Sequence, residues 1–234
     1  VLVHEKHGCI GFNSDGRRCG EGYSLEGEWK HWTPKGESIF NRIDEVETIV
    51  DEKTYTLHRK PNTAFMLNRQ AFIKQLANEA RELDVDIKTD DEIKTPSDLQ
   101  SDYIIDASGC PSVMRKKLGL KKGIIGITYQ QTLEQCSHFF EHTMRIYLTA
   151  DSGYYWIFPR DPKKKEVNLG MGMVIRKTRN LKNKLEQFKS KYDIQGDINY
   201  ETGGLIPAGI QKPLVFKNIL FVGDASVGTF PFSG

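Results

Sequence analysis

Three acidic residues stand at the ends of short apolar runs, where a carboxylate could bind a ligand. Glu5, Asp106 and Asp224 occupy these positions, and small residues and glycine follow the last two. In open α/β sheets, ligands bind outside the carboxyl ends of the strands, and the acid that ends the second strand of a dinucleotide-binding unit takes the ribose hydroxyls. Together the acids predict a cofactor cradle. Alone, Glu5 is better explained as a surface acid at a strand end, and the run before Asp224 is equally compatible with a core strand that ends in a turn.

A glycine-rich loop, Cys19-Gly20-Glu21-Gly22, is the second candidate. Its glycines would let the backbone press against a flat partner, and its cysteine would be accessible to redox chemistry. The alternative is a plain turn with a free thiol. Arg69 lies in the first turn of a helix that Asn68 is expected to cap, where a cation opposes the helix dipole unless an anion is nearby. The alternative for this residue is an ordinary exposed arginine.

An aromatic strand is the third candidate, and it spans Tyr154–Pro159. Alternation puts Tyr155 on one face of the strand. Three aromatic residues share the other face: Tyr154, Trp156 and Phe158. Another predicted strand holds Gly170-Met171-Gly172, where the missing side chains are expected to leave a gap opposite. An aromatic wall facing a gap suits a long apolar ligand, and an ordinary aromatic core is the alternative.

The elements that must position these residues follow from the spacing of apolar side chains. Two or three antiparallel strands are expected within residues 38–60, and a strand at 85–88. Further strands of an antiparallel sheet are expected at 124–132, 143–149, 154–159 and 166–175. The predicted helices begin at residues 68, 112 and 180, and the first carries Phe72, Leu76, Ala80 and Leu83 on one face. The runs that end at Asp106 and Val222 are expected to be strands buried on both faces.

The composition narrows the functional classes. The 234 residues are 38% hydrophobic and 27% charged, enough for one large domain or two small ones. A net charge of +2 argues against a nucleic-acid partner. No apolar run is long enough to span a membrane. The cysteines form no CxxC pair, which argues against a structural zinc site, and a reduced, cytosolic setting fits best.

In the order of these motifs, the sequence resembles the geranylgeranyl reductases, especially the archaeal digeranylgeranylglycerophospholipid reductases, within the para-hydroxybenzoate hydroxylase-like flavoproteins. The resemblance spans the chain, and its specific parts are the Cys19–Gly22 loop and the Tyr-x-Trp-x-Phe-Pro stretch. It implies a mixed α/β fold in two domains. A Rossmann-like FAD-binding domain, truncated at both ends, would comprise residues 1–37, 61–122 and 215–234. An antiparallel-sheet substrate domain with one covering helix would comprise residues 38–60 and 123–214.

The resemblance also implies roles for single residues. Glu5 would contact the adenosine ribose of FAD, Arg69 its polar stem and Asp224 its ribitol. The full set implied to bind FAD is Glu5, Cys19, Gly20, Gly22, Arg69, Asp106, Gly109, Asp224, Pro231 and Gly234. The set implied to line a prenyl pocket is Tyr154, Trp156, Phe158, Pro159, Gly170 and Gly172. Cys19 is the candidate proton donor, and no metal is implied.

The sequence departs from the family pattern in several places. The first strand, Gly-rich loop and first helix of the FAD domain are absent, residues 85–101 are too short for the usual β-meander, and Gly228 comes one position late. The chain is therefore interpreted as the central part of a longer protein that is inactive alone. An incomplete reading frame and a diverged paralogue both remain open as explanations.

The predicted function is saturation of isoprenoid double bonds in lipids by hydride transfer from reduced FAD. The electron donor is left open between ferredoxin, a deazaflavin and NAD(P)H, and so is peripheral contact with a membrane. A related flavin monooxygenase or halogenase is the alternative enzyme, because it shares the Asp-Gly and Gly-Asp motifs. A non-catalytic lipid-binding remnant or fragment is the alternative of another class.

Overall fold

The computed structural model has a mixed α/β fold and describes residues 1–11, 19–25, 32–150, 153–174 and 180–227. It forms two compact units. The first comprises Val1–Glu92, Tyr129–Met171 and Leu181–Thr202, and the second comprises Ile93–Thr128, Gly172–Asn180 and Gly203–Gly234. No helix in the described part of the chain is long and apolar enough to cross a membrane. The predicted mixed α/β class is confirmed, and the division into cofactor and substrate domains stays a prediction.

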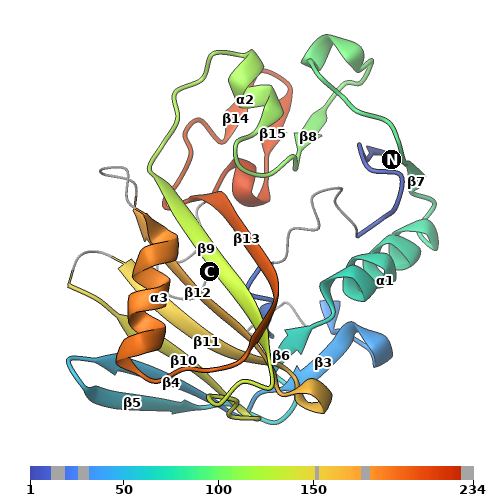
Figure 1. Ribbon diagram of the computed structural model, residues 1–234. Helices are drawn as coiled ribbons and strands as arrows, with labels where there is room; N and C mark the ends of the chain where they lie inside the picture. The colour runs from blue at the N-terminus through green and yellow to red at the C-terminus, as the bar shows by residue number, and fades with distance from the viewer. Residues whose placement is uncertain (12–18, 26–31, 151–152, 175–179, 228–234) are drawn as a thin grey trace. The chain divides into compact units, whose positions relative to one another are not determined.

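A seven-stranded sheet dominates the first unit, in the order β13-β9-β12-β11-β10-β4-β5 (Figure 1). Its strands are β4 (Glu45–Val50), β5 (Lys53–His58), β9 (Ile125–Glu134), β10 (Thr143–Leu148), β11 (Gly153–Asp161), β12 (Glu166–Val174) and β13 (Asp197–Pro207). The last residues of β12 and β13 and the first of β9 belong to the second unit. All of these strands except β13 are predicted by the apolar spacing.

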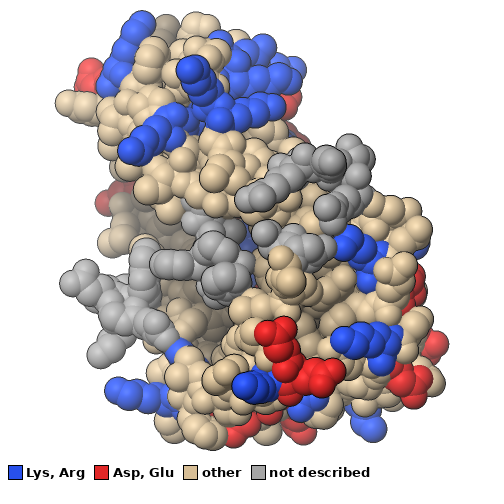
Figure 2. All heavy atoms as spheres, turned by 90° about the vertical axis from the view of Figure 1, so that its left-hand side faces the viewer, with Lys and Arg blue, Asp and Glu red and all other residues tan. Residues whose placement is uncertain are grey.

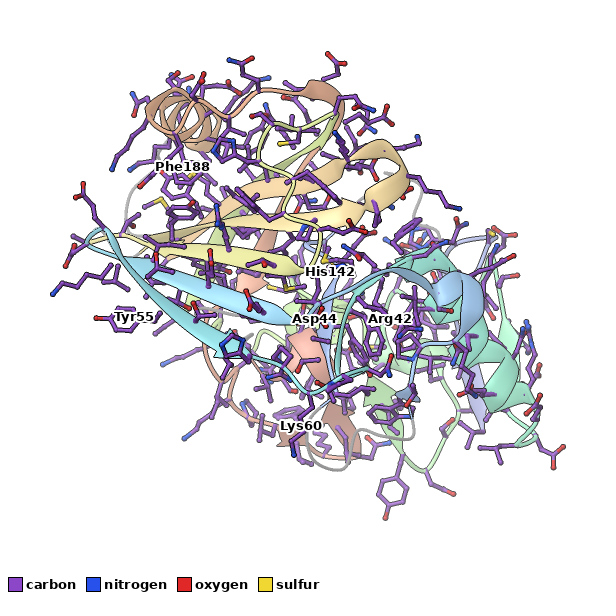
Figure 3. All side chains as sticks on the ribbon, turned by 90° about the horizontal axis from the view of Figure 1, so that it is seen from below. Arg42, Asp44, Tyr55, Lys60, His142 and Phe188 are labelled. Carbon is purple, nitrogen blue, oxygen red and sulfur yellow. The ribbon has the colours of Figure 1, made fainter. Side chains whose placement is uncertain are left out.

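The sheet was predicted to be antiparallel, and this is only partly correct. The pairs β4–β5 and β10–β11 are antiparallel, but β4 and β10 run parallel, with Glu47 opposite Arg145. Parallel neighbours need a long crossover connection, and here it is the whole segment between residues 50 and 143. β5 is an edge strand, and Tyr55 points away from the sheet there (Figure 3).

The two faces of this sheet carry different clusters. On one face lies α3 (Leu181–Lys191), and Tyr155 stacks on Phe188 with 4.2 Å between the ring centroids (Figures 1 and 3). On the other face, Trp156 and Phe158 pack with Met144 and other apolar side chains. The predicted alternation along the aromatic strand is therefore confirmed, and so is the predicted covering helix.

Smaller elements complete the first unit. The strands β2 (Gly22–Ser24), β6 (Ala64–Leu67) and β3 (Ile39–Arg42) form a three-stranded antiparallel sheet. β1 (Leu2–His4) and β7 (Asp86–Lys88) form a parallel pair. Helix α1 spans Arg69–Arg81. Leu83 was predicted to lie on the apolar face of this helix, but it lies beyond the end of the helix and is exposed.

The second unit holds a three-stranded sheet of β14 (Val215–Phe216), β15 (Ile219–Phe221) and β8 (Ile104–Asp106), with helix α2 at Val113–Lys117. β8 and β15 were predicted to be buried on both faces, and this is wrong. Ile104 and Ile219 pack with α2, whereas Ile105 and Leu220 are exposed. One short helix covers only one face of the sheet. Basic side chains gather on the surface of this unit (Figure 2).

Candidate functional site

The loop Cys19–Gly22 lies against the aromatic face of the seven-stranded sheet. A Cβ atom on Gly20 would be 3.2 Å from Cε2 of Phe158, and one on Gly22 would be 3.0 Å from Cε of Met144. These approaches are tighter than ordinary side-chain contacts, so a larger residue at either position would require Phe158 or the end of the Met144 side chain to shift. The structure thus brings together, within the first unit, two motifs that the sequence singled out separately.

Buried side chains of β9 and β12 hold the carbonyl groups of this loop. Gln130 donates to the carbonyl oxygen of Cys19 at 3.2 Å and accepts from Nε1 of Trp156 at 3.1 Å. Asn168 donates to the carbonyl oxygen of Gly20 at 3.1 Å. Both amide side chains are buried, and a buried polar group that finds a partner avoids the cost of desolvation. The same hydrogen bonds therefore satisfy the sheet interior and fix the loop backbone.

The buried side chain of Glu21 anchors the loop to the sheet. Its carboxylate is 4% exposed and lies 2.5 Å from Nε of Arg160, and Asn168 donates to the same oxygen at 3.2 Å. Arg160 also pairs with Glu166, and its guanidinium lies 4.1 Å from the ring centroid of Phe40. Burial opposes the positive charge, but the two carboxylates outweigh burial and raise the pKa of Arg160. We call these three charged residues the Glu21–Arg160–Glu166 network.

Cys19 and Arg69 are neighbours on the surface of the first unit. Nη1 of Arg69 lies 3.3 Å from Sγ of Cys19, and the backbone NH of Glu21 donates to the same sulfur at 3.2 Å. Arg69 is the first residue of α1, and the side chain of Asn68 accepts a hydrogen bond from the backbone NH of Ala71 at 3.3 Å. The predicted cap is confirmed. The cation at this helix start is thus placed beside an exposed thiol.

Glu5 follows the last residue of β1. Its backbone NH donates to the carbonyl oxygen of Lys88 at 2.8 Å, which continues the parallel pairing with β7. Oε1 of Glu5 accepts hydrogen bonds from the backbone NH of His7 at 2.9 Å and pairs with its Nδ1 at 2.7 Å. The carboxylate therefore stands at the predicted strand end, with one oxygen engaged by a local turn that the sequence did not predict.

β8 and β15 are neighbouring parallel strands of the second unit; Asp106 is the last residue of β8, and Asp224 lies in the turn after β15. Asp106 is buried, and its carboxylate accepts from the backbone NH of Ser108 at 2.9 Å and from the hydroxyl of Ser112 at 2.5 Å. Asp224 is exposed, within the 3-10 turn Gly223–Ala225. Asp106 therefore shapes the turn after β8, while Asp224 presents its carboxylate at the surface.

Open space lies beside the backbone of the second unit near these acids. Gly109 has φ +85° and Gly223 has φ +53°, and no atom of the described residues lies within 4 Å of a Cβ placed on either. Burial raises the pKa of the Cys110 thiol, and the negative charge of Asp224 raises it further. Both glycines therefore adopt a conformation that side chains disfavour, next to room for a ligand.

Arg115 holds the turn that carries Asp224. Its side chain is buried and donates to the carbonyl oxygens of Ala225 at 2.5 Å and of Gln211. Its guanidinium also lies 4.1 Å from the ring centroid of Phe221. Burial lowers the pKa of Arg115, and the charge of Asp106 partly offsets that shift. The arginine, which sequence reasoning placed only on a helix, thus joins α2 to β15 and the turn after it.

The gap predicted opposite the aromatic strand is not there. The indole of Trp156 overlaps the position that a Cβ of Gly170 would take, so Trp156 itself fills the space. Pro159 is buried, and its carbonyl oxygen accepts from Nδ2 of Asn41 at 2.9 Å. Tyr154 is half-buried, and burial raises the pKa of its hydroxyl. Gly172 is buried in β12 but belongs to the second unit.

Sequence reasoning missed the polar residues that organise the loop. Asn168 stands between the buried Val167 and Leu169 of β12, whereas Gln130 precedes two other buried polar residues of β9, Gln131 and Thr132. A polar residue at the centre of an apolar strand is a signal that could have identified Asn168. In the described ranges, no three or more His, Cys, Asp or Glu side chains form a group that could hold a metal ion. Pro231 and Gly234 lie outside those ranges.

Residues 125–204 match the family model described as the geranylgeranyl reductase catalytic domain. The curated digeranylgeranylglycerophospholipid reductase 1 of Methanosphaera stadtmanae is 27% identical over 252 aligned positions, which cover 93% of this chain and 61% of the relative. These findings confirm the resemblance to geranylgeranyl reductases. The chain spans less than two thirds of the length of that relative.

Two solved structures share the fold. A geranylgeranyl bacteriochlorophyll reductase-like protein of Thermoplasma acidophilum superimposes with a TM-score of 0.79 at 23% identity, covering 96% of this chain and 64% of that one. A flavoprotein/dehydrogenase of Cytophaga hutchinsonii gives a TM-score of 0.69 at 14% identity, covering 98% and 66%. At these identities the likeness concerns the fold.

Proposed function

We propose that this chain forms part of an FAD-dependent reductase that saturates C=C bonds of geranylgeranyl chains in lipids. The family match over residues 125–204 and the curated relative support this class of reaction. The observation that carries the proposal is the packing of Gly20 against Phe158. It places the loop implied to face the flavin next to the strand implied to face the prenyl chain, so the two implied sites would be neighbours in the first unit.

Each unit, taken by itself, carries residues whose chemistry fits a part of FAD. In the second unit, the exposed Asp224 offers a carboxylate for ribitol hydroxyls, and Gly109 and Gly223 leave room beside the backbone. In the first unit, the exposed Arg69 offers a cation for the phosphate stem, and Glu5 stands at a strand end suited to ribose hydroxyls. The chemistry of these groups is what a dinucleotide requires.

When bound, reduced FAD supplies hydride to an isolated alkene. The chain would then have two tasks, which are to orient the alkene and to exclude water. Trp156 and Phe158 would serve the first task indirectly, since both rings are buried in one cluster and Phe158 supports the Cys19–Gly22 loop. Cys19 is the candidate that would hold the proton for the second carbon, with its sulfur fixed by the backbone NH of Glu21 and by Arg69.

The same proposal names the other partners. The substrate would be an isoprenoid lipid, and the electron donor would be ferredoxin, a deazaflavin or NAD(P)H. The reaction would take place in the cytoplasm, with the protein meeting its lipid at the membrane surface. A nucleic-acid partner is not proposed, because the net charge is only +2.

The test of the cofactor is titration of the 234-residue chain with FAD, followed by flavin fluorescence. We expect weak, saturable binding, because no segment of the sequence matches a Gly-rich phosphate loop. Asp224→Ala should weaken it further, while Asp102→Ala, which removes another exposed carboxylate of the same unit, should not. Quenching that never saturates, or equal effects of both variants, would reject the proposed cofactor site.

The test of the reaction uses the complete reductase of which this chain is proposed to form part, with excess FAD and dithionite under argon, and a geranylgeranyl phospholipid. Mass spectrometry should show the gain of two hydrogens for each saturated bond. Incubation in air separates the monooxygenase alternative, because that enzyme would instead add oxygen to the substrate. Oxygenated product, with no saturated product under argon, would replace the reductase proposal.

A further inference from the structure

We propose that Glu21 and Arg160 are positioning residues, which hold the Cys19–Gly22 loop at a fixed distance from the aromatic strand. They touch the loop from its buried side, away from any ligand at its exposed side. The inference rests on the proposed function in one respect, which is that the exposed side of the loop faces the flavin. The contacts that hold the loop lie within the first unit and are independent of any cofactor.

The backbone of Glu21 is the first observation. Its φ is +64°, in the left-handed region that side chains rarely adopt, although it stands between two glycines. A glycine would take this conformation readily. A residue with a side chain persists there when its surroundings fix it, and the only deeply buried side chain of the loop is this glutamate, which is 4% exposed. The backbone conformation of Glu21 therefore indicates that the loop needs the buried carboxylate of this residue to keep its position.

The ion pair is the second observation. Oε2 of Glu21 lies 2.5 Å from Nε of Arg160, and the second nitrogen arm of Arg160 pairs with Glu166. Glu166 in turn accepts from Nδ2 of Asn199 at 2.9 Å. Arg160 thus bridges two buried carboxylates, and removal of one partner would leave a buried charge without compensation. A loop anchored in this way has one position rather than several.

Gln130 and Asn168 fix the backbone of the loop as well as its side chain. They hold the carbonyl oxygens of the two residues before Glu21, at 3.2 and 3.1 Å. With the carboxylate fixed as well, three consecutive residues of the loop are attached to the same sheet face that carries Trp156. The depth of the loop above the aromatic ring is then determined by the sheet and not by the ligand.

The backbone NH of Leu67 reports on this arrangement. It donates to the carbonyl oxygen of Glu21 at 2.8 Å, and Leu67 is 5% exposed. Its hydrogen can therefore exchange with solvent only when the loop moves away. Exchange at this one amide measures the position of the loop without flavin, so failure of the proposed function would leave the measurement intact.

The experiment is hydrogen exchange of the 234-residue chain with Glu21→Gln, which keeps the shape of the side chain and removes its charge. We expect exchange at Leu67 to become about tenfold faster, because a buried charge loses its partner. Glu21→Gly should give the same acceleration although it relieves the backbone strain. Arg160→Lys, which keeps the charge, should give a smaller acceleration than Arg160→Gln.

The matched control is Glu47→Gln. Glu47 forms an ion pair with Nε of Arg145 at 2.7 Å in the same sheet and does not touch the loop. It should leave exchange at Leu67 unchanged. If both Glu21 variants change the Leu67 rate less than twofold, the proposal is overturned. It is overturned equally if the amides of β10 accelerate as much as Leu67, because the effect would then be general destabilisation.

Discussion

The indole of Trp156 lies directly over Gly170, on the neighbouring strand of the sheet. The ring occupies the space that a side chain at position 170 would need. Trp156 is 6% exposed and is held by Gln130, so it has little freedom to withdraw. The pair therefore restricts both positions: the glycine permits the tryptophan, and the tryptophan excludes anything larger than glycine.

Gly170→Ala should therefore destabilise the protein. Overpacking of a buried site costs about 1–3 kcal/mol, and here the clash is with a ring that is hydrogen-bonded in place. Urea unfolding followed by circular dichroism measures the change. Gly204→Ala is the control, because a Cβ at Gly204 would meet nothing within 4 Å. Equal unfolding midpoints for the two variants would contradict the packing described.

Arg115→Gln should unfold at a lower urea concentration than the parent chain. The variant leaves several buried carbonyl oxygens, including those of Ala225 and Gln211, without their donor, and each such group costs about 1–3 kcal/mol. Lys116→Gln is the matched control, since it is the exposed neighbour on the same helix. A loss no larger than that of the control would show that Arg115 does not hold the turn.

Acid should weaken the contacts of Glu201. Hydrogen bonds from Tyr129, Gln131 and Lys182 lower its pKa from 4.5 to about 2 in the folded protein. Because the folded value is the lower one, the stabilisation is complete above pH 4.5 and is lost as the pH falls toward 2. Its size should stay below about 1 kcal/mol, because the carboxylate is partly exposed and screened.

Glu201→Gln tests this pH dependence. The stability of the variant, measured by urea unfolding at intervals between pH 5 and pH 2.5, should fall less steeply than that of the parent. Glu141→Gln, at an exposed side chain, should follow the parent curve. If the Glu201 variant follows it as well, the carboxylate is not the group that titrates.

The four thiols should differ in reactivity toward Ellman's reagent. Cys9 and Cys19 are exposed and should react first, whereas Cys136 is buried and should react only after unfolding. Burial also raises the pKa of the Cys110 and Cys136 thiols, which leaves less thiolate at neutral pH. Cys136→Ser should remove the denaturant-dependent phase alone. Rapid reaction of all four thiols in the native protein would contradict the burial.

Much of the fold follows from local patterns in the sequence. Asn68 identifies the start of α1, and the alternation of aromatic side chains identifies the two faces of β11, because both patterns depend on neighbours in the sequence. The exposed faces of β8 and β15 do not follow from such patterns. An apolar run such as Ile104-Ile105 has the same sequence whether one face or both faces are covered.

For the candidate site too, the sequence shows local features but not contacts between distant residues. Its acids and glycines are recognisable because their types and spacing are informative by themselves. Gln130, Arg160 and Asn168 are not, because their role depends on a loop more than a hundred residues away. The filled space at Gly170 was missed for a related reason: sequence shows that a side chain is absent, but not which neighbour takes its place.

The distance along the chain between the loop and its anchors has a consequence for folding. Glu21 lies 139 positions before Arg160 and 147 before Asn168. Contacts of such separation cost more chain entropy than local contacts, and they slow folding. The ribosome also completes the Cys19–Gly22 loop long before the residues that give it shape. Any product of early termination or proteolysis that ends before Asn168 contains the loop sequence but lacks the side chain that holds the carbonyl oxygen of Gly20 and the carboxylate of Glu21.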